Sequence, residues 1–167
     1  WFITQKETWY PLYALILFFV FRQYRWTGFW VFLAMALVVT LADQISVKVF
    51  KFGLERPRPS HNEALDGLIH IINNYRGGAY GFVSSHAANT FGFATLTTRI
   101  FNQRWVVWAL FIWATVVSYS RIYLGVHYPG DIIGGALLGI IIGYSVYLLY
   151  RYLMQRIAEN YSTKQYE

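Results

Sequence analysis

Five long stretches of this chain contain no Asp, Glu, Lys or Arg, and this feature limits the folds that the chain can adopt. They cover residues 8–21, 26–42, 77–98, 105–120 and 132–150. A helix that crosses a bilayer needs roughly 17–25 predominantly apolar residues, and flanking long side chains can extend to the interface. The sequence therefore predicts an all-α, polytopic transmembrane helix bundle with spans at about residues 9–21, 27–50, 84–99, 105–123 and 131–151.

Composition favours a membrane protein over a soluble helical bundle. Hydrophobic residues make up 56% of the chain, aromatic residues 20% and charged residues only 13%, unlike average soluble domains. Nearly every predicted helix is apolar on all faces, whereas a surface helix of a soluble protein has a polar face. The chain has no cysteine, which excludes disulfides and thiolate metal sites. The net charge of +6 forms no basic stripe, so no nucleic-acid partner is expected.

The basic residues predict an orientation for a single integral-membrane domain, residues 1–167. Short turns and the tail on one side of the bundle carry Arg22, Arg25, Arg99, Arg104, Arg151, Arg156 and Lys164. The positive-inside rule assigns that side to the cytoplasm. The long polar connection at 51–83 then faces the periplasmic or outer side of a bacterial inner (cell) membrane. The chain also starts on that side, which leaves room for a sixth helix upstream.

Small residues mark one face of the last span. Asp131, Gly135, Gly139 and Gly143 recur every four residues, so they lie roughly along one face of a helix. Small residues at this spacing allow another helix to approach closely. We therefore expect Asp131 to point into the bundle.

Three polar clusters converge on the outer side. The first holds Lys51 and Arg58, the second is Ser84-Ser85-His86 at the start of the third span, and the third runs from Arg121 to Asp131. Each alone has an ordinary explanation as an interface anchor, a helix cap or a polar surface group. Together, cations beside a helix N-terminus predict a phosphate site. Its expected phosphate-binding residues are Lys51, Arg58, Ser84, Ser85 and Arg121.

Two histidines can divide the chemistry of phosphoryl transfer. A nucleophile attacks phosphorus while an acid on the opposite side protonates the departing oxygen. Asp131 follows His127 by one helical turn and can fix its tautomer, so His127 is the expected nucleophile. His86 is then the expected acid, and afterwards the base for water. No carboxylate cluster matches a two-metal centre, so neither a metal nor a cofactor is expected.

The spacing within these clusters is that of a known signature. The chain resembles the type 2 phosphatidic acid phosphatase superfamily, membrane lipid phosphatases related to vanadium haloperoxidases, through Lys51-x6-Arg58-Pro59, Ser84-x-His86 and Ser120-Arg121-x5-His127-x3-Asp131. The motifs extend over about half the chain. The resemblance implies a six-helix membrane fold, a metal-independent site near the outer surface and a phosphohistidine intermediate on His127.

One motif departs from the family pattern. This chain reads Val83-Ser84-Ser85-His86 where the family usually has Pro-Ser-Gly-His. The loss of glycine removes access to unusual backbone angles, but Ser85 can still donate its N–H and adds a hydroxyl. We expect activity to be retained. The family spacing uses Arg58, so Arg56 is expected to be peripheral.

A site between helices at the membrane surface implies a phosphate carried by a lipid. The candidates are undecaprenyl diphosphate, phosphatidylglycerophosphate, phosphatidic acid and the phosphates of lipid A. Short turns leave little room to build a site for a large sugar head group, which favours undecaprenyl diphosphate. Two alternatives stay open: a lipid phosphotransferase, which passes the phosphoryl group to another alcohol, and a non-catalytic lipid-phosphate binding or transport protein.

Overall fold

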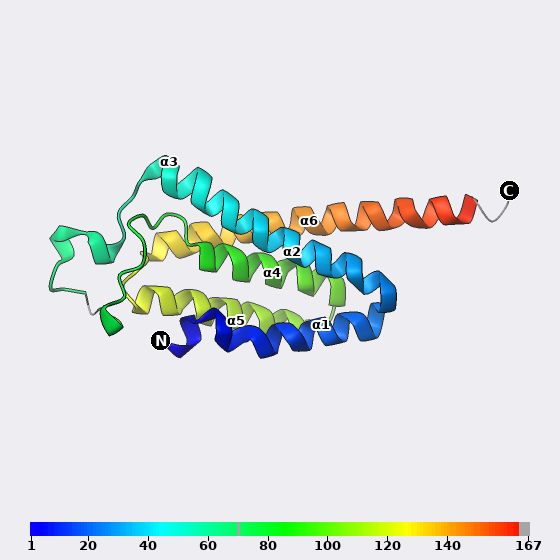
Figure 1. The fold of residues 1–167 in the computed structure, drawn as a ribbon, viewed down its shortest axis with the longest axis horizontal. Coiled ribbons are helices and arrows are strands. Elements are labelled where there is room, and N and C mark those ends of the chain that lie inside the picture. The colour runs from blue at the N-terminus through cyan, green and yellow to red at the C-terminus, as the bar shows by residue number, and fades with distance from the viewer. Residues whose placement is uncertain (70, 164–167) are drawn as a thin grey trace.

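The computed structural model describes residues 1–69 and 71–163, so Lys164 lies outside the described residues. The long helices are α1 (Tyr10–Tyr24), α2 (Gly28–Ile45), α4 (Ser85–Phe101), α5 (Arg104–Tyr123) and α6 (Pro129–Thr163). They form one elongated bundle in which α4 is central, and α6 extends beyond the other helices (Figure 1). No β-strand occurs among the described residues. The predicted all-α class is confirmed.

Short helical segments connect the long ones. Before α1 lie η1 (Phe2–Thr4) and η2 (Lys6–Trp9), and η3 (Arg25–Thr27) joins α1 to α2. α2 continues as a π-helical segment, η4 (Ser46–Lys51), followed by the single turn α3 (Phe52–Leu54). The polar connection contains three 3-10 turns, η5 (Pro59–His61), η6 (Glu63–Leu65) and η7 (Ile72–Asn74).

The predicted helices agree with the observed ones in order and nearly in their bounds. The span predicted at 27–50 corresponds to α2 with η4, and the spans predicted at 84–99 and 105–123 correspond to α4 and α5. The largest difference is at α6, which continues to Thr163 rather than ending near 151. Its polar C-terminal part contains neither Pro nor Gly, so nothing in the sequence stops the helix there.

The number of membrane spans is not confirmed. Among the described residues, three stretches are long and apolar enough to cross a membrane, Lys6–Leu54, Arg104–Tyr123 and Pro129–Asn160, and the first contains both α1 and α2. α4 is not among them. Its side chains are mostly buried, and several carry hydroxyl groups, because it contacts α2, α5 and α6. A helix enclosed by other helices needs no strongly apolar surface.

The contact between α4 and α6 is the most extensive in the bundle. A Cβ at Gly135 would lie 2.5 Å from the carbonyl oxygen of Ser84. A Cβ at Gly139 or Gly143 would overlap the carbonyl oxygen of Ala88 or Gly92 in the same way. The predicted close approach along this face of α6 is therefore confirmed, and it brings the N-terminal ends of α4 and α6 together.

The elements that carry the predicted site residues meet at one end of the bundle. The C-terminal end of η4, the start of α4, the end of α5 and the start of α6 all lie there, next to the long connection (Figure 1). The N-terminal residues of the chain lie beside the end of α5 at the same end. The arginine-containing turns between α1 and α2 and between α4 and α5 lie at the opposite end.

Replacing Gly139 tests the contact between α4 and α6. We expect Gly139→Ala to destabilise the protein by about 1–3 kcal/mol, because the added methyl group meets backbone rather than a side chain that can move. Thermal unfolding in detergent measures the effect. Gly130→Ala in the same helix is the matched control, because its Cβ meets no atom within 4 Å. Equal unfolding midpoints for the two variants would contradict the close contact.

Candidate active site

His127 and Asp131 form a buried pair at the start of α6. The Nδ1 atom of His127 lies 3.3 Å from Oδ2 of Asp131, and the two residues are 3% and 0% exposed. Asp131 also accepts a hydrogen bond from the backbone N–H of Tyr128 at 2.9 Å. Because the carboxylate accepts the Nδ1 proton, the imidazole presents the lone pair of Nε2 on its other side. The arrangement has the His–carboxylate geometry that the spacing predicted.

Arg56 holds the other oxygen of the same carboxylate. Its Nη1 lies 2.7 Å from Oδ1 of Asp131, and its guanidinium lies over the ring of Tyr128 at 4.3 Å from the centroid. The expectation that Arg56 is peripheral is wrong. The sequence indicated only that Arg56 accompanies Arg58, because alternate residues of an extended Arg-Pro-Arg-Pro segment point to the same side.

Arg58 lies on the opposite side of the His127 ring. Its Nη1 is 3.3 Å from Nε2 of His127, and its Nε donates to the carbonyl of Tyr80 at 3.0 Å. The backbone of the connection approaches this side chain closely, since a Cβ at Gly77 would lie 2.8 Å from Nη1 of Arg58. Arg58 is 7% exposed. The connection therefore fixes a buried guanidinium next to Nε2 of His127.

Lys51 and the start of α4 form the next part of the site. Lys51 donates to Oγ of Ser85 at 2.7 Å, and Ser46 donates to the same oxygen at 2.8 Å. Ser84 caps α4 by accepting from the N–H of Ala87 at 3.4 Å, and its own N–H donates to the carbonyl of Asp131 at 3.0 Å. In this structure the hydroxyl that replaces the family glycine thus orients Lys51.

Arg121 completes the cationic set from the end of α5. It donates to the hydroxyl of Thr4 and to the hydroxyl of Tyr75 at 3.1 Å. Its Nε is buried and has no hydrogen-bond partner among the described residues. A buried donor without a partner costs free energy. Arg121 therefore has donor capacity that an anion in the site would satisfy.

His86 faces a pocket of about 190 Å³ that it shares with Arg121. Residues of the N-terminal segment and Tyr75 form the rest of its wall. The structure thus gathers all eight predicted residues at one end of the bundle, on segments from η4 to α6. Sequence reasoning missed Arg56, Thr4 and Tyr75. No local pattern indicates the last two, because their contacts with Arg121 join residues 117 and 46 positions apart.

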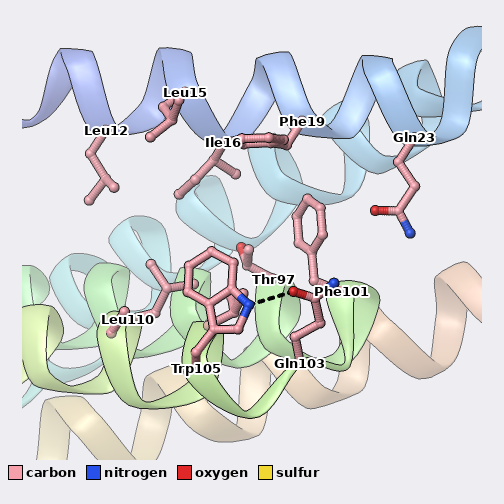
Figure 2. Close-up of a pocket in the computed structure, with 12 residues that line it drawn as sticks. Leu12, Leu15, Ile16, Phe19, Gln23, Thr97, Phe101, Gln103, Trp105 and Leu110 are labelled. Carbon is pink, nitrogen blue, oxygen red and sulfur yellow. Dashed lines mark hydrogen bonds between the residues drawn. The ribbon is translucent and has the colours of Figure 1, made fainter.

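A second pocket lies away from this site, between α1, α4 and α5. Figure 2 shows Leu12, Ile16 and Phe19 of α1 facing Trp105 and Leu110 of α5, with Gln103 accepting from the Trp105 indole at 2.6 Å. The pocket has a volume of about 240 Å³ and no titratable side chain in its wall. It is not a candidate for phosphoryl-transfer chemistry.

Burial lowers the pKa of the His127 imidazole from 6.5 to about 4, although its hydrogen bond to Asp131 acts in the opposite direction. The nearby guanidinium groups of Arg58 and Arg121 also lower the pKa. At neutral pH the ring is therefore neutral. A neutral imidazole whose Nδ1 proton is held by a carboxylate is the form that can attack phosphorus through Nε2.

The part of the chain that the structure describes does not form a metal site of the usual kind. Across residues 1–69 and 71–163, no group of three or more His, Cys, Asp or Glu side chains is placed to hold a metal ion. The cations Lys51, Arg58 and Arg121 lie at the same end of the bundle and could neutralise the charge on a phosphate. That the site works without a metal stays a prediction.

The apolar helices are those of an integral membrane protein, and the basic, histidine-containing end of the bundle has groups that could bind a phosphate ester. The family model described as the PAP2 superfamily matches residues 27–155. The chain belongs to this superfamily, as its motifs predicted. Two relatives are named lipid A 4'-phosphatase: one from Bacteroides thetaiotaomicron, 38% identical over 92% of this chain and 69% of the relative, and one from Porphyromonas gingivalis, 37% identical over 92% and 66%.

A more distant relative is the undecaprenyl-diphosphatase of Sulfolobus acidocaldarius, 30% identical over 81% of this chain and 60% of its own length. The chain thus spans about two thirds of the length of the two lipid A 4'-phosphatases. The sequence predicts a phosphoric monoester or diphosphate hydrolase. All three relatives are named phosphatases, which confirms the hydrolase class and supports a phosphoric monoester hydrolase.

Solved structures agree with the fold. The transmembrane PAP2-type phosphatidylglycerolphosphate phosphatase of Bacillus subtilis superimposes with a TM-score of 0.64 at 22% identity, over 92% of this chain and 72% of that one. Aquifex aeolicus LpxE superimposes with a TM-score of 0.58 at 27% identity, over 87% and 80%. The first likeness concerns the fold alone.

The protonation state of His127 can be measured directly, because the chain has only four histidines. We expect the ¹⁵N signals of His127, assigned with His127→Gln, to show a neutral ring protonated on Nδ1 from pH 8 down to about pH 5. Because burial disfavours the charged form and lowers the pKa of His127 to about 4, the midpoint of protonation should lie near pH 4. A titration midpoint at 6.5 or above would contradict the buried, neutral nucleophile.

Proposed function

We propose that this protein is a lipid phosphatase that hydrolyses a phosphate monoester on a glucosamine-based lipid of the lipid A type. The observation that carries this proposal is the similarity to the two lipid A 4'-phosphatases, which extends over 92% of the chain at 38% and 37% identity. Lipid A phosphate was one of the alternatives left open by the sequence.

Undecaprenyl diphosphate, which the short turns favoured, is less well supported. The undecaprenyl-diphosphatase of Sulfolobus acidocaldarius is less similar and matches a smaller part of the chain, 30% identity over 81%. The N-terminal segment also adds wall area to the pocket beside His86, so short turns elsewhere do not exclude a large head group. The proposed substrate is therefore a phosphorylated sugar lipid.

In the proposed first step, Nε2 of His127 attacks phosphorus. A P–N bond forms, the bond between phosphorus and the lipid oxygen breaks, and His86 gives a proton to the departing oxygen. Burial and the nearby cations lower the pKa of His86 to about 3 in the free site, so His86 takes up this proton when the anionic phosphate binds beside it. Asp131 keeps the proton on Nδ1 and stabilises the imidazolium that develops, and Arg56 keeps Asp131 in place. Backbone N–H groups at the start of α4 and the cations Lys51, Arg58 and Arg121 stabilise the phosphoryl oxygens.

In the proposed second step, water attacks the phosphohistidine while His86 accepts a proton from it. The P–N bond breaks, inorganic phosphate leaves and His127 returns to its neutral form. Ser84 and Ser85 lie at the helix N-terminus that would bind the phosphate, and Ser85 also orients Lys51. The whole site would face the periplasmic or outer side of a bacterial inner membrane, in keeping with the arginine-containing turns at the opposite end.

Phosphate release from a panel of pure lipid phosphates in detergent, with a chelator present, tests the proposal. We expect lipid A to be turned over with a higher kcat/KM than undecaprenyl diphosphate or phosphatidic acid. His127→Ala should lower the rate by roughly 1,000-fold or more, because the variant has no nucleophile. Arg22→Ala, at the other end of the bundle, is the control and should retain activity.

Several outcomes would contradict the proposal. A higher kcat/KM for undecaprenyl diphosphate than for lipid A would support undecaprenyl diphosphate, the substrate that the sequence favours. Transfer to an added alcohol lipid that outpaces phosphate release would identify a phosphotransferase. Binding of lipid phosphate without turnover, unaffected by His127→Ala, would identify a binding or transport protein.

A further inference from the structure

We propose that the pocket between the N-terminal segment and His86 binds the sugar part of the substrate, on the leaving-group side of the phosphate. This inference rests on the proposed function and adds to it a subsite and the residues that determine specificity. Gln5, Lys6 and Glu7 supply the polar groups of this pocket, and Trp1 and Tyr75 supply its aromatic side. None of the three motifs includes these residues.

The position of the pocket assigns it to the leaving group. Its wall contains His86, the proposed acid, and Arg121, one of the proposed phosphate-binding cations. An acid must lie within hydrogen-bond reach of the oxygen that it protonates. The lipid oxygen bonded to phosphorus therefore lies beside His86, and the group attached to that oxygen extends into the pocket.

The wall of the pocket suits a sugar better than a polyprenyl chain. The amide of Gln5, the ammonium group of Lys6 and the carboxylate of Glu7 can form hydrogen bonds with the hydroxyl and amide groups of an amino sugar. An apolar polyprenyl chain would leave these three side chains without hydrogen-bond partners in the substrate. The rings of Trp1 and Tyr75 meet edge to face, with centroids 5.3 Å apart. Such rings combine an apolar body with a polar tip, which suits a sugar that has both C–H and O–H surfaces.

The N-terminal segment is held in place by several hydrogen bonds. The hydroxyl of Thr8 donates to the carbonyl of Phe2 at 2.7 Å, and the indole of Trp9 donates to the carbonyl of Ile3 at 2.8 Å. Thr4 accepts from Arg121. These contacts fix Gln5, Lys6 and Glu7 relative to the catalytic end of the bundle, so the pocket is largely formed before a substrate binds.

The closing experiment compares two substrates in three variants. Substrate preference is defined as kcat/KM for lipid A divided by kcat/KM for phosphatidic acid, which carries no sugar. We expect Gln5→Ala and Lys6→Ala each to lower this preference about 3- to 20-fold, mainly through KM for lipid A, because each removes a hydrogen bond to the sugar. Lys48→Ala is the matched control, an exposed lysine outside the pocket, and should leave the preference unchanged.

Inhibition by inorganic orthovanadate, a phosphate analogue without a sugar, provides the second readout. It should be equal in the parent, Gln5→Ala and Lys6→Ala, since the phosphate site does not include these side chains. An unchanged preference in both variants, or a loss of vanadate inhibition that parallels the loss of activity, would overturn the sugar subsite. Failure of the proposed function would be seen instead in the parent protein, as no turnover of lipid A.

Discussion

The backbone contact between α4 and α6 is the constraint on which the site depends. Gly135, Gly139 and Gly143 leave no room for a side chain between the helices, and a Cβ at any of them would overlap a carbonyl oxygen of α4. The N–H of Ser84 can therefore reach the carbonyl of Asp131 at 3.0 Å. One helix supplies His86 and the other supplies Asp131, so this contact sets the relation between the proposed acid and the His–Asp pair.

Asp131 belongs both to the α4–α6 contact, through its backbone carbonyl, and to the proposed catalytic pair, through its carboxylate. It is fully buried, and its two oxygens are shared among the His127 ring, the N–H of Tyr128 and Arg56. A buried carboxylate is costly unless it is paired and hydrogen-bonded. The same contacts that satisfy the charge also fix the tautomer and direction of the His127 ring, which leaves Nε2 facing Arg58. Stability and catalytic geometry thus depend on the same group.

Much of this arrangement could be predicted from the sequence because its signals are local. Uncharged runs give the helices, and the four-residue spacing of glycines gives the α4–α6 contact. The three motifs indicate residues that the structure brings to one end of the bundle. The predicted number of five spans is not confirmed, because α4 is buried among helices and its composition reflects those neighbours rather than lipid.

The contacts that could not be predicted join distant parts of the chain. Thr4 and Tyr75 meet at Arg121 only because the N-terminal segment and the long connection both fold over the end of α5. Arg56 is different, since its position in Arg-Pro-Arg-Pro placed it on the same side as Arg58. Its pairing with Asp131 depends on where α6 begins, which the local sequence does not determine.

We propose that His127 forms a covalent intermediate during catalysis, and trapping that intermediate tests the mechanism most directly. Parent protein would be mixed with lipid A radiolabelled in its phosphate, quenched in alkali within one turnover, and digested for mass spectrometry. If His127 is the nucleophile, we expect a label that is stable to alkali, labile to acid and confined to His127. Release of inorganic phosphate with no labelled protein at any time, or a label on another residue, would contradict it.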